Sequence, residues 1–281
     1  MAISINTNVA SINAQRNLGK TQGSLMGNLG RLSTGLRINT AADDAAGLAI
    51  SEKLKSQIRS LSQAERNAND GISMLQTAEG AMNEVSGILG RMRELSVQSA
   101  NGTLGATERQ FLEDESAQLV SELDRIAAVT EFNGTSLLGG GTTGTTFTFQ
   151  VGIGATSNDT ISANVKGTAA TDLGGVTGGL STIDISTATG AQAALSTIDQ
   201  AIDDVSSARA DIGGVQNRLN VTISNLGSAR ETLSAANSRI RDVDVASETA
   251  AMTRNNILMQ AGVSVLAQAN QMPSVALSLL G

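Results

Sequence analysis

The chain has 281 residues and a formal net charge of −7, and it contains no Cys, His, Trp or Tyr. These values exclude thiol and imidazole catalysis, disulfides and the commonest transition-metal ligands, and they disfavour nucleic-acid binding, which draws on clustered Lys and Arg. We therefore expect no enzymatic activity, cofactor, metal or nucleic-acid partner, and a thin aliphatic core of the kind found in helical bundles.

The first predicted element is an amphipathic helix over residues 3–36, with apolar residues at helical spacing and Gly35 as its stop signal. Residues 1–30 contain no basic segment followed by an apolar one, so we expect no cleaved secretory signal. No apolar run approaches the ~20 residues needed to span a bilayer, so we expect no membrane partner.

Asp43 and Asp44 lie in a segment, residues 37–51, that predicts a turn before the next helix. Two neighbouring carboxylates are one way to bind a metal ion or to perform acid–base chemistry. No third ligand lies nearby in a recognisable pattern, and we therefore interpret both residues as linker or helix-capping residues.

A long helix is predicted from about residue 52 to residue 100, because aliphatic and small residues recur there every seven positions. Asn69-Asp70-Gly71 taken alone is a hairpin-turn signal. The heptad runs through it in register on both sides, and one helical Gly costs only ~1 kcal/mol relative to Ala. We therefore predict an unbroken helix.

A break at residues 101–105 follows the long helix. Thr107 followed by Gln110 resembles a capping box that opens a third helix, ending near Thr130. Residues 133–190 are then rich in Gly and Thr, which disfavours helix. Alternating apolar residues over 147–153 predict a strand, with weaker strands over 161–165 and 183–185.

Seven aliphatic residues at strict seven-residue intervals, from Ile198 to Ile240, predict one helix of roughly 70 Å. The second line of the same heptad carries the polar residues Arg209, Gln216, Arg230 and Asn237. We interpret this pattern as a helix with one edge packed in its own bundle and the other edge facing solvent or a neighbouring subunit.

The last predicted helix covers residues 250–280, and Pro273 is expected to bend or end it. The first and last helices each carry more apolar surface than a lone terminal helix can bury, so each needs the other or a neighbour. The predicted fold class is mainly α, a long antiparallel helical bundle or coiled coil with a small β-rich excursion in the middle of the chain.

The predicted division follows these elements, with terminal segments 1–45 and 242–281, bundle segments 46–132 and 191–241, and the excursion 133–190. The predicted bundle core consists of Leu61, Leu75, Met82, Leu89, Ile198, Val205, Ile212, Leu219, Leu226 and Leu233. The apolar residues predicted to drive association of the terminal helices are Ile5, Val9, Ile12, Leu25, Leu29, Leu32, Met259, Val263, Leu266, Leu277 and Leu280.

The chain closely resembles bacterial flagellin, and the resemblance covers roughly residues 2–138 and 195–281. The matching motifs are RLSTGLRIN at 31–39, DDAAG at 43–47, NANDGIS at 67–73, RMRELSVQSANG at 91–102 and GVSVLAQANQMP at 262–273. The resemblance implies a subunit that polymerises with copies of itself into the flagellar filament for swimming motility. Its terminal segments would form the inner core of the filament and its bundle segments the outer core.

The resemblance also implies partners for this chain. These are an export chaperone on the C-terminal helix within the type III pathway, the filament cap and the hook–filament junction proteins. A Toll-like receptor of a host is a further implied partner, through Arg91, Leu95 and Glu115. From the residues alone, Arg91 and Glu94 are interpreted instead as an i,i+3 pair on a solvated helix face.

Three alternatives compete with the filament subunit. A hook–filament junction protein would share the terminal pattern without forming long fibres. An enzyme would need a catalytic insertion, and the Gly- and Thr-rich excursion has no His, Cys or Glu. A membrane-active amphipathic coiled coil would bind liposomes through residues 250–281, which their low basic content disfavours.

Overall fold

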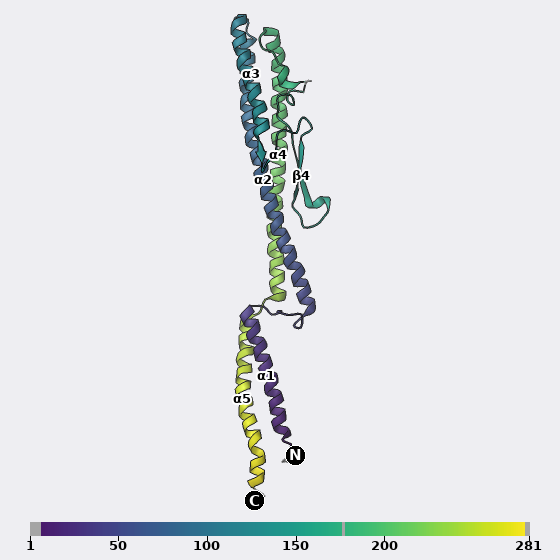
Figure 1. The fold of residues 1–281 in the computed structure, drawn as a ribbon, viewed down its shortest axis with the longest axis vertical. Helices are drawn as coiled ribbons and strands as arrows, with labels where there is room; N and C mark the ends of the chain where they lie inside the picture. The colour runs from purple at the N-terminus through teal and green to yellow at the C-terminus, as the bar shows by residue number, and fades with distance from the viewer. Residues whose placement is uncertain (1–6, 176–177, 279–281) are drawn as a thin grey trace. The chain divides into compact units, whose positions relative to one another are not determined.

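The computed structural model describes residues 7–175 and 178–278, with side chains up to Met272. The chain is mainly α and divides into two compact units. We call Arg59–Arg230 the bundle unit, and Met1–Ile58 together with Glu231–Gly281 the terminal unit. The long helices are α1 (Val9–Thr34), α2 (Ala45–Ser99), α3 (Ala106–Val129), α4 (Ala188–Arg241) and α5 (Val245–Ser278) (Figure 1).

The bundle unit is built on α2, α3 and α4, which lie side by side in Figure 1. The heptad lines of α2 and α4 form one apolar core with Leu123 and Ala127 of α3. Nine of the ten predicted core residues are buried: Leu61, Leu75, Met82, Leu89, Ile198, Val205, Ile212, Leu219 and Leu226. Leu233, which belongs to the terminal unit, is half-buried.

Near the start of α4, the second line of the heptad differs from the prediction. Seven-residue spacing places Leu195 and Ile202 on the same line as Arg209, and both are half-buried, whereas the structure fully buries the alanines one residue earlier, Ala194 and Ala201. Leu173 and Leu180 of the excursion belong to the same core as these alanines. Alanine lets a second layer approach the helix closely, and heptad spacing alone does not reveal that layer.

The described part of the excursion, together with the two residues before it, forms two antiparallel hairpins. A short one pairs β1 (Glu131–Phe132) with β2 (Thr135–Ser136), and Asn133 and Gly134 supply the positive φ angles of its turn. The other pairs β3 (Thr145–Gln150) with β4 (Thr160–Val165), placing Phe149 opposite Ile161. Short 3₁₀ turns lie at η1 (Ser157–Asp159) and η2 (Gly179–Thr182).

The strand predicted over 147–153 was wrong in part, and the strand predicted over 183–185 was wrong. Val151 and Ile153 lie beyond the end of β3, and residues 183–185 form no strand. Side chains of the helices hold this last segment instead, because Glu113 accepts a hydrogen bond from Ile185 N at 2.7 Å and Ser99 Oγ donates to the Ile185 carbonyl. Carboxylates likewise bind the excursion backbone at Ala170 through Asp124 and at Gly174 through Asp204.

Helix boundaries account for the remaining differences. α2 begins at Ala45, so the second part of the predicted turn, residues 45–51, is helical. α3 begins at Ala106 with Gly105 as its N-cap and no side-chain cap, so the predicted Thr107 capping box was wrong. α5 begins at Val245 and continues past Pro273 to Ser278, so Pro273 does not end it. Gly35 ends α1 in the left-handed conformation at φ 70°, as predicted.

Gly71 explains why a turn-like sequence lies inside α2. A Cβ added at Gly71 would lie 2.9 Å from Cδ1 of Phe149, so the bare helix backbone is the surface on which the β3 side chain rests. Asn67 supports the same contact, since its Nδ2 donates to the Gln150 carbonyl at 3.0 Å. The Gly at this position therefore serves the packing of the excursion on the helix.

We expect Gly71→Ala to destabilise the bundle unit by about 1–3 kcal/mol, because the added methyl group overpacks the contact with Phe149. Gly80→Ala is the matched control, since a Cβ at that exposed position of the same helix meets nothing within 4 Å. The control should be stabilised by roughly 0.5–1 kcal/mol through helix propensity. Urea unfolding of both variants measures the difference, and equal stabilisation of the two would contradict the assigned role of Gly71.

Candidate functional site

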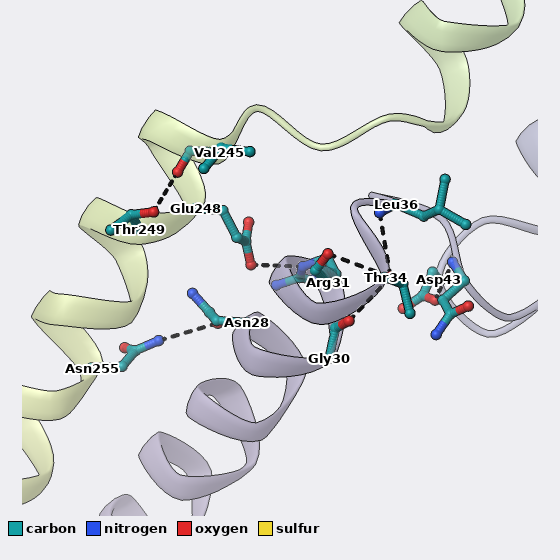
Figure 2. A network of polar contacts seen from close by, with 11 residues as sticks. Asn28, Gly30, Arg31, Thr34, Leu36, Asp43, Val245, Glu248, Thr249 and Asn255 are labelled. Carbon is teal, nitrogen blue, oxygen red and sulfur yellow. Dashed lines mark hydrogen bonds and ion pairs between the residues drawn. The ribbon is translucent and has the colours of Figure 1, made fainter.

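The pairing of α1 with α5 in the terminal unit is the first feature of the candidate site. The two helices run antiparallel and are joined at several levels by polar groups. Asn8 Nδ2 donates to the Ala269 carbonyl at 2.7 Å, and Ser11 Oγ donates to Asn270 Oδ1 at 2.7 Å. Near the other end Arg31 Nε lies 2.7 Å from Glu248 Oε1 (Figure 2). We call this set of contacts the polar seam.

Asn28 and Asn255 belong to the same seam and face each other in Figure 2. In the amide orientation that satisfies both ends of the Asn28 side chain, its oxygen accepts a hydrogen bond from Met252 N of α5 at 3.2 Å. Within α1, the two buried residues are Ser11 and Asn28, and both are polar. Ala269 of α5 is buried, but the larger apolar side chains of the interface are only half-buried: Leu18, Leu25, Leu32, Met252, Met259 and Leu266. The pair is therefore held by a mixed interface of polar contacts and mostly half-buried apolar side chains.

Apolar side chains also point away from the pair. On α1 the exposed ones are Val9, Ile12, Met26 and Leu29, and on α5 they are Val245, Ile257, Leu258, Val263, Val265 and Met272. We call these two sets the outward stripes of α1 and α5. Part of the α5 stripe is a shallow apolar groove that runs from Val245 to Leu258. Exposed apolar patches of this extent mark interaction surfaces.

The predicted association residues fall into three groups. Val9, Ile12, Leu29 and Val263 lie on the outward stripes. Leu25, Leu32, Met259 and Leu266 lie half-buried in the interface between α1 and α5. Ile5 and Leu280 lie outside the described residues, as does the side chain of Leu277. Sequence reasoning missed Ile257, Leu258 and Val265, because α5 carries apolar residues on every side and its periodicity singles out no face.

The terminal unit has two linkers, one between α1 and α2 (residues 35–44) and one between α4 and α5 (residues 242–244), and these are paired with each other. Leu36 and Asp242 form an isolated antiparallel bridge, with Arg37 N donating to the Arg241 carbonyl and Val243 N donating to the Gly35 carbonyl. Arg37 Nη2 also donates to the Ile240 carbonyl at 2.6 Å, which satisfies one of the free carbonyls at the end of α4.

Asp43 is a linker residue and Asp44 is a helix cap, in agreement with the sequence interpretation. Asp43 accepts hydrogen bonds from Thr40 N at 2.9 Å and from Asn39 N at 3.1 Å. These bonds, the Thr40 hydroxyl and the nearby charge of Arg31 lower the pKa of the Asp43 carboxyl group. Asp44 Oδ1 accepts from Gly47 N at 2.9 Å at the start of α2. Among the described residues, no three His, Cys, Asp or Glu side chains converge as a metal site.

The polar residues on the second heptad line of α4 do not face solvent as a group. Within the bundle unit, Arg230 forms an ion pair with Glu65 at 2.5 Å and Gln216 donates to Glu79 at 3.0 Å, so both reach across to α2. Within the terminal unit, Asn237 accepts from Ser51 Oγ at 2.7 Å. Three of the four polar residues on this line therefore make contacts between the two long helices, where the sequence predicted an edge that faces solvent or a neighbouring subunit.

Arg91 and Glu115, two of the three receptor residues implied by the resemblance, lie together on the surface of the bundle unit. Arg91 Nη2 lies 2.8 Å from Glu115 Oε1, and Arg91 Nη1 lies 3.0 Å from Glu94 Oε2. The hydrogen bonds from Glu115 and then Glu94 raise the pKa of Arg91. Leu95 has no exposed surface, because it belongs to the bundle core. A partner could therefore reach the Arg91–Glu115 pair directly, but not Leu95.

Across the part of the chain that the structure describes, no helix combines the length and the apolar character needed to cross a membrane.

Comparisons with known proteins cover both ends of the chain. A family model for the bacterial flagellin N-terminal helical region matches residues 5–143, and one for the C-terminal helical region matches residues 195–280. A protein named flagellin from Halalkalibacterium halodurans is 49% identical over 98% of this chain and 99% of its own length. The flagellar filament 33 kDa core protein of Treponema phagedenis is 45% identical over 98% of this chain and 99% of its own length. Among solved structures, Bacillus cereus flagellin is 34% identical over 57% of this chain and 88% of its own, with a TM-score of 0.48.

Proposed function

This chain belongs to the bacterial flagellin family and is a structural subunit of the extracellular flagellar filament, which polymerises through its terminal helical regions. From this premise we propose that the surfaces in contact between neighbouring copies are the outward stripes of α1 and α5. In this proposal one copy covers the α1 stripe of its neighbour and another covers the α5 stripe. Contacts between two different surfaces leave a free surface on each added copy, so the assembly remains open and grows.

The exposure of the α5 stripe is the observation that carries this proposal. Ile257 is 62% exposed and Leu258 is 50% exposed, although both are large aliphatic residues. Fully burying one such side chain contributes about 1.5–3 kcal/mol, which the single chain leaves unused. A helix that is apolar on all sides is stable only when neighbours surround it. The terminal helices therefore gain most of their stability on assembly.

We also propose that the predicted segments occupy different layers of the filament. Segments 1–45 and 242–281 would form the inner core of the filament, segments 46–132 and 191–241 the outer core, and the excursion 133–190 the outer surface. The long apolar core of the bundle unit supports this proposal, since α2, α3 and α4 bury their heptad lines without help from another chain.

We further propose the finer partners. An export chaperone would cover the apolar stripe of α5 before secretion, and the filament cap and hook–filament junction proteins would contact the terminal helices at the two ends of the filament. A host Toll-like receptor would meet the surface pair Arg91–Glu115, with Leu95 supporting that surface from the core. The exposure of the α5 stripe and of this ion pair supports the chaperone and receptor proposals.

Electron microscopy of the purified protein after salting-out tests the assembly. We expect long helical fibres from the full chain and none from a chain that ends before Val245, whose bundle unit is intact. A hook–filament junction protein would give no long fibres under the same conditions. Absence of fibres from the full chain over a range of salt and seed concentrations would count against the filament subunit.

A further inference from the structure

We propose that the polar seam, and the Arg31–Glu248 ion pair above all, sets the specificity of filament assembly by holding α1 and α5 in the one rotation that leaves both stripes facing outwards. This inference rests on the proposed function, since it concerns the faces that neighbouring copies would cover. It assigns the polar residues between the terminal helices a role in assembly that apolar burial alone does not supply.

Apolar burial alone does not determine which faces of α1 and α5 meet. Successive residues of a helix are ~100° apart, so turning α1 by about one residue would carry Met26 towards α5 in place of Leu25. On α5, Ile257 lies nearly opposite Met259, and each could fill an apolar contact equally well. Apolar burial therefore separates the two rotations poorly, because turning the stripes inwards would expose the leucines and methionines that the pair now half-buries.

The polar seam opposes that rotation. Arg31 and Glu248 retain side-chain exposures of only 33% and 16%, so their charge-assisted contact is partly removed from water. Turning either helix would separate this pair, and it would also break the Ser11–Asn270 contact at the opposite end of α1. Polar groups at a few interface positions are known to fix register and partner choice in helical pairs, at some cost in stability.

The position of the ion pair suits this role. Arg31 lies in the last turn of α1 and Glu248 in the first turn of α5, next to the two paired linkers (Figure 2). Thr34, one turn from the ion pair, bonds the Leu36 amide through its hydroxyl at 3.3 Å. The ion pair therefore fixes the rotation of both helices close to the linkers. The other polar contacts of the seam hold the same rotation along the length of α1 and α5.

Charge reversal tests the proposal with four proteins: wild type, Arg31→Glu, Glu248→Arg and the combined swap. The critical concentration for seeded polymerisation is measured by sedimentation. Each single reversal should raise it by about tenfold or more, because like charges then face each other across the seam. The combined swap should return it to within about threefold of wild type, the remainder arising from Asp43, which would then face Glu at position 31. Arg125→Glu, which makes the same charge change on the bundle surface, is the control and should polymerise like wild type.

Mixing the two single variants separates a contact within one chain from a contact between copies. A pair made within the chain cannot be restored by mixing, so the equimolar mixture should polymerise as poorly as either variant alone. Recovery in the mixture, no recovery in the combined swap, or wild-type behaviour of both single variants would each overturn the inference. Thermal unfolding of the bundle unit should be unchanged in all four proteins. Failure of wild type itself to polymerise would overturn the proposed function, and with it this inference.

Discussion

Replacing Ile257 and Leu258 together with Asp is expected to abolish filament formation while leaving a folded, soluble bundle unit. Both residues lie on the α5 stripe, exposed by 62% and 50%. Assembly would have to bury two carboxylates without partners, each at a cost of several kcal/mol, and would lose about 1.5–3 kcal/mol of apolar burial per site. The critical concentration for seeded polymerisation should rise by at least about a hundredfold.

Val221→Asp is the matched control for this variant. Val221 is also an aliphatic residue that is 62% exposed, but it lies on α4 in the bundle unit. We expect fibres from the control, seen by electron microscopy at protein concentrations at which the α5 variant gives none. Fibres of normal length from the α5 variant would show that neighbouring copies cover some other face of α5.

Leu75→Ala is expected to lower the stability of the bundle unit by about 3 kcal/mol, within the range of 2–5 kcal/mol that such core truncations cost. Leu75 has no exposed surface and belongs to the continuous core that α2 shares with α4. The loss includes the transfer free energy of the removed atoms and the cavity left behind. For a unit of this size the melting temperature should fall by roughly 10 °C.

Val97→Ala provides the comparison on the same helix, because Val97 is 51% exposed. Its effect should stay within about 0.5 kcal/mol, as for most surface substitutions. Thermal unfolding followed by circular dichroism measures both variants. A Leu75 variant that melts with the control would mean that the α2 heptad line is not the main source of stability in this unit.

The helices of the bundle unit were predictable because one simple rule, burial of a heptad stripe, governs them. The stripe carries α2 through Asn69-Asp70-Gly71 despite the local turn signal. The excursion was predicted less well, because its backbone is held by distant side chains. No sequence signal near residues 183–185 predicts that Glu113 and Ser99 bind this segment.

The candidate site shows the same limit. The apolar content of the terminal helices was readable, and so was the need of each for a partner. The face that each helix turns to the other was not, since Leu25 and Met26 are adjacent and equally apolar, yet one is half-buried and the other is 63% exposed. The choice depends on Arg31, Ser11 and their contacts on α5, more than 200 residues away in the chain.

The line of polar contacts between α2 and α4 removes an ambiguity that the apolar heptads create. Both helices repeat aliphatic residues every seven positions, so sliding one along the other by seven residues would replace each core side chain with a similar one. The free energy of apolar burial is therefore similar in each of these alignments. Ile223 lies midway between Gln216 and Arg230 on α4, the partners of Glu79 and Glu65. A slip of seven residues in either direction brings one of these two glutamates level with Ile223, so a single alignment remains in which both carboxylates are bound.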